Sequence, residues 1–174
     1  AYVAGFGSSR RLVLYDTLLS GHSEDEVLFV VAHELGHYKH NHILKGALIS
    51  IVGLFVTLAI LSALVRIDGV WTWAGANGLR DARAIPVLLL FALVATLVSL
   101  PVQNTISRHF EAQADSEAFH LMPDVGVAVR SFRQIALKNL ADLDPPRIVV
   151  WALFTHPPTT DRIEAALAHA GASP

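Results

Sequence analysis

The sequence contains no cysteine. Disulfide bonds and thiolate metal sites are therefore excluded, and any metal ion must be held by nitrogen and oxygen ligands. Charged residues make up only 16% of the 174 residues, and the formal net charge is −2. The chain also lacks a run of basic side chains, so its electrostatics give no support for nucleic-acid binding.

Two long apolar stretches account for much of the hydrophobic fraction of 53%. Residues 46–65 carry no charge and are long enough to cross the hydrocarbon core of a bilayer as a helix. Residues 84–106 form a second such stretch, with Pro101 near its end. We expect the two to form a transmembrane helical hairpin. The alternative is a pair of buried core helices in a soluble domain.

The string His33-Glu34-Leu35-Gly36-His37 indicates a metal-dependent catalytic site. Positions i and i+4 of a helix share one face, so His33 and His37 can ligate the same metal ion. Glu34 is offset by one position and can act as a base beside the metal without being a ligand. This combination is typical of zinc-dependent hydrolysis, and we expect one zinc ion here.

The residues around this string predict a helix. Ser23 is a good N-cap, and Glu26 three residues later completes a capping box. The apolar residues that follow recur with a helical period: Val27, Val30, Val31, Leu35 and Tyr38. The alternative is a histidine-rich surface helix without a metal.

A catalytic zinc ion usually has a third protein ligand. A metzincin would need glycine at position 40 and histidine at position 43, where this chain has His40 and Ile43, so that class is excluded. Glu111 is the better candidate, because a transmembrane hairpin returns the chain to the side of the membrane that holds the first two ligands. Asp115, four residues later on the same helical face, is expected to bind the far nitrogen of a ligating histidine. The alternative for Glu111 is an ordinary surface acid.

The other histidines of the motif regions are expected to be solvated or to support the ligands. They are His40, His42, His109 and His120.

Several motifs occur in a fixed order along the chain. HELGHYKHNH (33–42) is followed by the hydrophobic hairpin, by SRHFEAQAD (107–115) and by HPPTTDRI (156–163). Together they resemble the CAAX prenyl protease 1 family of integral-membrane zinc endopeptidases, and RRLVLYDTLL (10–19) and ALKNLADLD (136–144) are similar to the family's intervening segments. The resemblance implies a helical chamber in the membrane, with His33, His37 and Glu111 as zinc ligands and Glu34 as general base.

The resemblance also implies roles for residues that spacing alone does not assign. His156 would stabilise the oxyanion of the reaction, and Arg162 would pair with a carboxylate near the metal or with the substrate. The substrate would add as an extended strand to the edge formed by residues 2–6, with Tyr2 and Val3 at that edge.

We therefore predict a mainly α-helical, zincin-type metalloprotease domain over residues 1–174, with the transmembrane hairpin and a short N-terminal β-hairpin or edge strand. It would be a fragment of a larger integral membrane protein, in the bacterial inner membrane or the endoplasmic reticulum, with its site on the cytoplasmic side. Its partners would be membrane lipid and a peptide or protein substrate, prenylated or not.

Two other functions stay open at this point. One is a heat-shock-type membrane metalloprotease that degrades misfolded membrane proteins. The other is a catalytically silent membrane scaffold that binds zinc for stability. Glu34 argues against the scaffold, because a structural zinc site has no need of an unligated carboxylate.

Overall fold

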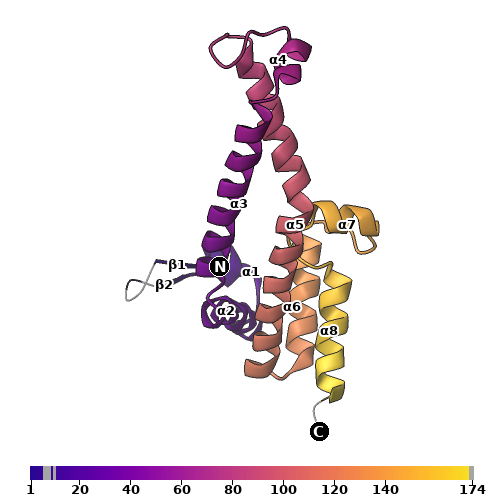
Figure 1. The fold of residues 1–174 in the computed structure, drawn as a ribbon. Coiled ribbons are helices and arrows are strands. Elements are labelled where there is room, and N and C mark those ends of the chain that lie inside the picture. The colour runs from indigo at the N-terminus through magenta and orange to yellow at the C-terminus, as the bar shows by residue number, and fades with distance from the viewer. Residues whose placement is uncertain (6–8, 10, 173–174) are drawn as a thin grey trace. The chain divides into compact units, whose positions relative to one another are not determined.

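The computed structural model describes residues 1–5, 9 and 11–172, and it is mainly helical as predicted. Strands β1 (Tyr2–Ala4) and β2 (Arg11–Val13) pair antiparallel, with Tyr2 opposite Val13, which confirms the predicted N-terminal strand pair. The helices follow in chain order (Figure 1): α1 (Asp16–Gly21), α2 (Glu24–Lys39), α3 (His42–Leu64), α4 (Asp68–Ala74), α5 (Ala84–Leu121), α6 (Val125–Lys138), α7 (Arg147–Leu153) and α8 (Thr159–Ala172).

The chain divides into two compact units. Residues 1–43 and 102–174 form the first, and residues 44–101 form the second. Helix α5 is continuous from the second unit into the first, with Pro101 inside it. The predicted second apolar stretch and the helix of Glu111 are therefore one element.

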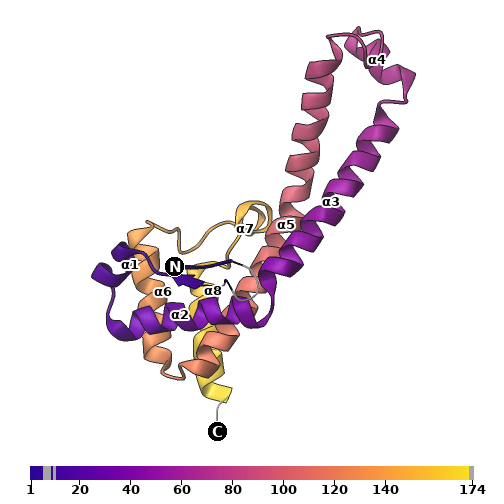
Figure 2. The ribbon, with the colours of Figure 1, turned by 90° about the vertical axis from the view of Figure 1, so that its left-hand side faces the viewer.

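The first unit has a core of small and aromatic side chains from α2, α5, α6 and α8. Phe29 of α2 lies at its centre, with its ring in edge contact with Phe132 at 5.4 Å and stacked on Phe119 at 6.1 Å. Ala118 and Ala128 are almost fully buried and let the helices come close together. This core orients α2, which runs across α5 and α6 in Figure 2.

Helix α2 begins and ends at local sequence signals. The predicted capping box is present, because the Ser23 hydroxyl accepts from the Glu26 amide and the Glu26 carboxylate accepts from the Ser23 amide. At the other end, Asn41 adopts a left-handed conformation with φ of 54°, which asparagine tolerates well. This residue turns the chain so that α3 starts at His42, close to α2.

The second unit consists of α3, α4 and the first part of α5. Trp71 packs with Ala84 and Val87, and its indole donates to the Val65 carbonyl at 2.9 Å. Helices α3 and α5 are long and apolar enough to cross a membrane, and 0% and 6% of their most apolar 18 residues are buried. Within the described chain these two helices are therefore exposed rather than buried in a core, as the predicted transmembrane hairpin requires.

Helix α5 is longer than a membrane is thick. Its 38 residues extend over about 57 Å, whereas the hydrocarbon core of a bilayer is about 30 Å thick. The apolar residues occupy the stretch 84–106, so the polar residues from 107 onward belong to the part of α5 beyond it.

Candidate metal centre

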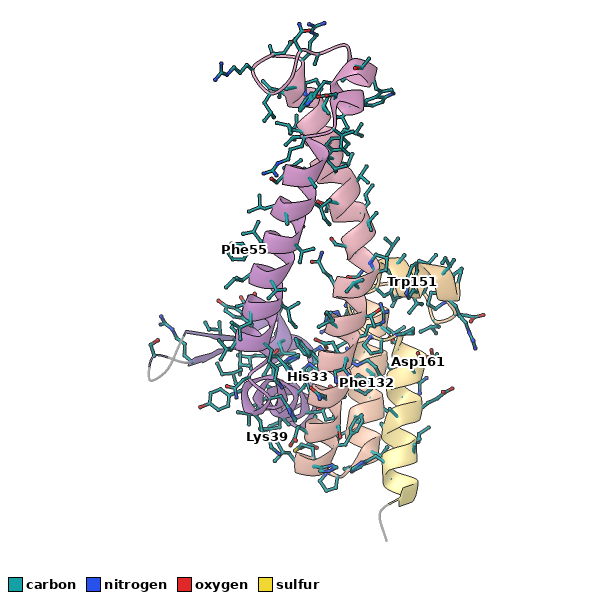
Figure 3. All side chains as sticks on the ribbon, viewed as in Figure 1. His33, Lys39, Phe55, Phe132, Trp151 and Asp161 are labelled. Carbon is teal, nitrogen blue, oxygen red and sulfur yellow. The ribbon has the colours of Figure 1, made fainter. Side chains whose placement is uncertain are left out.

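Three side chains from α2 and α5 converge at one point of the first unit. The Nε2 atoms of His33 and His37 are 3.1 Å apart. Glu111 of α5 lies 3.4 Å from His33 Nε2 through Oε2 and 3.3 Å from His37 Nε2 through Oε1. Figure 3 shows His33 projecting from α2 toward α5.

This geometry fits a divalent cation. Tetrahedral zinc with ligands at about 2.0–2.1 Å holds neighbouring ligand atoms roughly 3.3–3.4 Å apart. The ligand atoms of His33, His37 and Glu111 all lie within 4.8 Å of one another. Among the described residues, Oε2 of Glu111 is buried without a hydrogen-bond partner. Two imidazoles and a carboxylate with an unsatisfied oxygen form a donor set that a zinc ion would complete.

Asp115 supports His33 from the side away from the centre. Its Oδ1 lies 2.8 Å from His33 Nδ1, so an Nδ1–H that donates to this oxygen leaves Nε2 directed at the centre. Arg162 of α8 holds Asp115 by donating from Nε to Oδ2 at 2.8 Å and from Nη2 to Oδ1 at 2.6 Å. Arg162 thus pairs with a carboxylate that is itself bonded to His33, and its predicted role beside a metal ion stays a prediction.

Burial and charge act in opposite directions on these groups. Burial opposes the charged form of His33, but the Asp115 and Glu111 carboxylates outweigh it and raise its pKa to about 9. Burial likewise opposes ionisation of Glu111, yet the His33 and His37 rings hold the pKa of this carboxyl well below its usual range. The pKa of Asp115 is also lowered, because hydrogen bonds from His33 and Arg162 outweigh its burial. Both carboxyl groups are therefore anionic.

His156 reaches the centre from the loop after α7. Its Nε2 lies 3.4 Å from Oε2 of Glu111, and its side chain is 58% exposed. The loop is anchored to α5, because Arg108 donates to the carbonyls of Val150 and Phe154 at 2.8 and 2.6 Å. Asn104, one turn earlier, donates to the Ala152 carbonyl at 2.6 Å.

An open cavity of about 550 Å³ adjoins the centre. His33, Glu111 and His156 line one part of it, and Arg162 lines it as well. The remaining wall is largely apolar and includes Phe29, Val30, Phe132, Ile135 and Phe154. A largely apolar space therefore lies beside the three converging side chains.

Neither Glu34 nor Tyr2 makes a hydrogen bond or ion pair with His33, His37 or Glu111 among the described residues. Glu34 is half-buried on α2 and makes no side-chain hydrogen bond or ion pair within the described part of the chain. Tyr2 is partly exposed, with its ring 5.8 Å from that of Tyr15. Val3 lies in β1 opposite Leu12, and Phe6, in the predicted substrate edge, lies outside the described residues. The roles of these residues stay predictions.

Sequence reasoning predicted Glu111 and Asp115 of α5 but missed Asn104, Arg108 and Gln113 of the same helix. Asn104, Arg108, Glu111 and Asp115 follow one another at intervals of four, three and four residues, which places them along one helical face. That periodicity would have singled out Asn104 and Arg108. Gln113 carries no such signal, since its partner His42 is 71 residues away in sequence.

The chain is similar to known proteins over nearly its whole length. The model of peptidase family M48 matches residues 1–170. The uncharacterized metalloprotease YhfN of Bacillus subtilis is 34% identical over 170 residues, which cover 95% of this chain and 39% of that protein. CAAX prenyl protease 1 of Saccharomyces cerevisiae is 27% identical over 181 residues, which cover 95% of this chain and 40% of that protein.

A solved structure is also similar. The crystal structure of S. mikatae Ste24p superposes with a TM-score of 0.79 at 26% identity, covering 95% of this chain and 42% of that one. The chain therefore spans about two fifths of the length of these relatives.

Proposed function

The chain belongs to peptidase family M48, as its motifs predicted, and on this basis we propose that it carries the catalytic site of a zinc-dependent membrane endopeptidase. The observation that carries the proposal is the convergence of His33, His37 and Glu111 at ligand spacing, with one carboxylate oxygen buried and unsatisfied. A zinc ion bound there would supply water activation and polarisation of the scissile carbonyl.

The side chains around the ligands have three further roles: proton transfer, stabilisation of the oxyanion and orientation of His33. Glu34 accepts a proton from the attacking water, whose oxygen bonds to the carbonyl carbon. The same carboxyl then gives that proton to the amine nitrogen as the carbon–nitrogen bond breaks. His156, exposed at the mouth of the cavity, donates a hydrogen bond to the developing oxyanion. Asp115 and Arg162 keep His33 oriented.

Two features support a peptide substrate that reaches the site at a membrane. Helices α3 and α5 are apolar enough to cross a bilayer. The strand pair leaves an edge at which an extended peptide can add by backbone hydrogen bonds, beside Tyr2 and Val3. Some relatives are named CAAX prenyl proteases, which suggests a prenylated substrate, whereas the name of the Bacillus relative specifies none.

The proposal is tested by replacing Glu34 with glutamine in the full-length protein. We expect peptide hydrolysis to fall by roughly 10²–10⁴-fold while the zinc content stays at one ion per chain. The matched control is Glu24→Gln, an exposed position on the same helix, which should leave both quantities unchanged. Hydrolysis by the Glu34→Gln variant at the wild-type rate would show that the mechanism is wrong.

The substrate is tested with three compounds. A farnesylated peptide, the same peptide without the lipid, and an unmodified transmembrane protein are offered to the full-length enzyme. Preference for the farnesylated peptide supports prenyl-protein processing. Preference for the unmodified membrane protein supports a quality-control role. Zinc binding without hydrolysis of any of them would favour the silent scaffold.

A further inference from the structure

His42, the first residue of α3, lies against the second metal ligand. Only 5% of its surface is exposed. Its Nδ1 lies 2.8 Å from Nδ1 of His37, and its Nε2 lies 3.0 Å from Oε1 of Gln113. Both nitrogens of this buried ring are therefore engaged, one with the metal helix α2 and the other with α5.

Packing holds the His42 ring in this orientation. The ring is stacked on Phe110 of α5, with the centroids 4.3 Å apart and the planes inclined by 7°. His40 stacks with it as well, at 5.5 Å and 14°. The left-handed turn at Asn41 brings the start of α3 to this place. The ring cannot rotate without displacing its neighbours, so Nδ1 stays directed at His37.

The hydrogen bonds along this chain of groups have a defined direction. A glutamine Oε1 can only accept, so His42 donates to Gln113 from Nε2. The other nitrogen of a neutral His42 is then an acceptor, and His37 donates to it from Nδ1. The lone pair of His37 is left on Nε2, the atom that faces Glu111 at 3.3 Å.

We propose that His42 and Gln113 are positioning residues that fix His37 in the tautomer able to bind the metal ion. The inference rests on the metal centre of the proposed function and adds to it a support for the second ligand. His33 is oriented by a carboxylate, Asp115, whereas His37 is oriented by a neutral imidazole whose own tautomer is set by an amide.

The orientation of the Gln113 amide decides the outcome. If the amide turned over, its NH₂ group would donate to His42 Nε2. His42 would then donate to His37 from Nδ1, and the proton of His37 would sit on Nε2, where it blocks metal binding. A residue at 113 that can only accept a hydrogen bond must therefore preserve the His37 tautomer that binds metal. A residue that can neither accept nor donate a hydrogen bond must weaken the preference for that tautomer.

The experiment measures zinc affinity of the full-length protein by competition with a chromogenic chelator. His42→Phe retains an aromatic ring against Phe110 but has no acceptor, and we expect zinc affinity to fall by about 10- to 100-fold. His42→Asn places an amide oxygen near the position of Nδ1 and should restore most of that loss. His109→Phe is the matched control, because His109 is an exposed histidine of α5 that takes no part in this arrangement, and it should bind zinc like the wild type.

A second pair of variants tests the amide directly and leaves His42 in place. Gln113→Glu should bind zinc at least as tightly as the wild type, and Gln113→Leu should bind it more weakly. The visible spectrum of the cobalt-substituted protein should change in His42→Phe and Gln113→Leu, and remain unchanged in Gln113→Glu.

The outcomes separate this inference from the proposed function. Equal zinc affinity of wild type, His42→Phe and Gln113→Leu would overturn the positioning role and leave the metal centre intact. Equal losses in His42→Phe and His42→Asn, or in Gln113→Leu and Gln113→Glu, would also overturn it, since they would report packing alone. A wild-type protein that binds no zinc would overturn both. If His42→Phe does not fold by circular dichroism, the Gln113 pair decides.

Discussion

A β-carbon on Gly36 would lie 2.8 Å from the α-carbon of Ala114 and 2.9 Å from its carbonyl oxygen. Helix α2 therefore crosses α5 at a point where neither backbone has room for another atom. Gly36 lies between His33 and His37 on α2, and Ala114 lies between Glu111 and Asp115 on α5. The absence of one side chain at the crossing lets the two histidines of α2 come together with Glu111 of α5.

Replacing Gly36 with alanine should weaken both the fold and the metal site. Alanine favours a helix by about 1 kcal/mol over glycine, but overpacking against backbone costs about 1–3 kcal/mol. We expect a net loss of stability and weaker zinc binding, because α2 must move away from α5. Thermal unfolding of the metal-free protein and chelator competition measure the two effects.

Gly46→Ala is the control for that change. Gly46 is also helical, and nothing lies within 4 Å of the β-carbon that alanine would add. Its zinc affinity should equal that of the wild type. If Gly36→Ala behaved like Gly46→Ala, the close crossing would not matter for the site.

Substitutions of Asp115 and Arg162, which form an ion pair, should have non-additive effects on the free energy of unfolding. The side chains of Asp115 and Arg162 are 4% and 13% exposed, so Arg162→Leu leaves the buried carboxylate with His33 as its remaining partner and should cost about 3–5 kcal/mol. The double variant Asp115→Asn/Arg162→Leu removes the charge as well and should be less destabilised than the sum of the single changes. Chemical unfolding in a double-mutant cycle measures the coupling, and strictly additive losses would contradict it.

The residues of this site that could be predicted from the sequence are those that lie close together along one helix. Two pairs of residues are each four positions apart on one helix, namely His33 with His37 and Glu111 with Asp115. This spacing predicts that the two side chains of each pair lie on the same face. Asn104 and Arg108 lie on the same face of α5 as Glu111 and Asp115. Their partners are backbone carbonyls of α7, which a pattern of side chains in the sequence cannot reveal.

Other features depend on tertiary structure and could not be predicted in this way. The bond between His42 and Gln113 requires the crossing of α2 and α5 and the turn at Asn41. The continuity of α5 through residue 106 was also missed, since a change from apolar to polar residues does not by itself end a helix. Pro101 lies within that helix without breaking it.

Glu111 should be required for zinc binding. Glu111→Gln keeps the size of the side chain but replaces an anionic oxygen with a weaker neutral donor, so we expect most of the zinc to be lost on dialysis. Glu117→Gln is the control, because Glu117 lies on the same helix but bonds to Lys39 and His40. Elemental analysis gives the metal content. A Glu111→Gln protein that keeps one zinc ion per chain would remove this residue from the ligand set.

Arg108 should affect catalysis without affecting the metal. Its guanidinium holds the last carbonyls of α7, and His156 follows two residues after Phe154. Arg108→Ala should let the loop shift and lower kcat by roughly 10- to 100-fold, with unchanged zinc affinity. Arg147→Ala, an exposed position at the other end of α7, is the control. Loss of zinc in Arg108→Ala would indicate a general collapse of the site instead.

The capping box that begins α2 should make stability depend on acid pH. The Ser23 backbone amide holds the pKa of Glu26 below its ordinary value of 4.5, against the opposing effect of burial. A lowered folded-state pKa stabilises the fold above pH 4.5, and that contribution is lost as the pH falls through the folded value. The neutral Glu26→Gln variant can keep the hydrogen bond but not this titration. The difference in melting temperature between wild type and Glu26→Gln should therefore be largest near neutral pH and shrink on acidification. A difference that stayed constant until the carboxyl was fully protonated would show that the charge of Glu26 does not stabilise the start of α2.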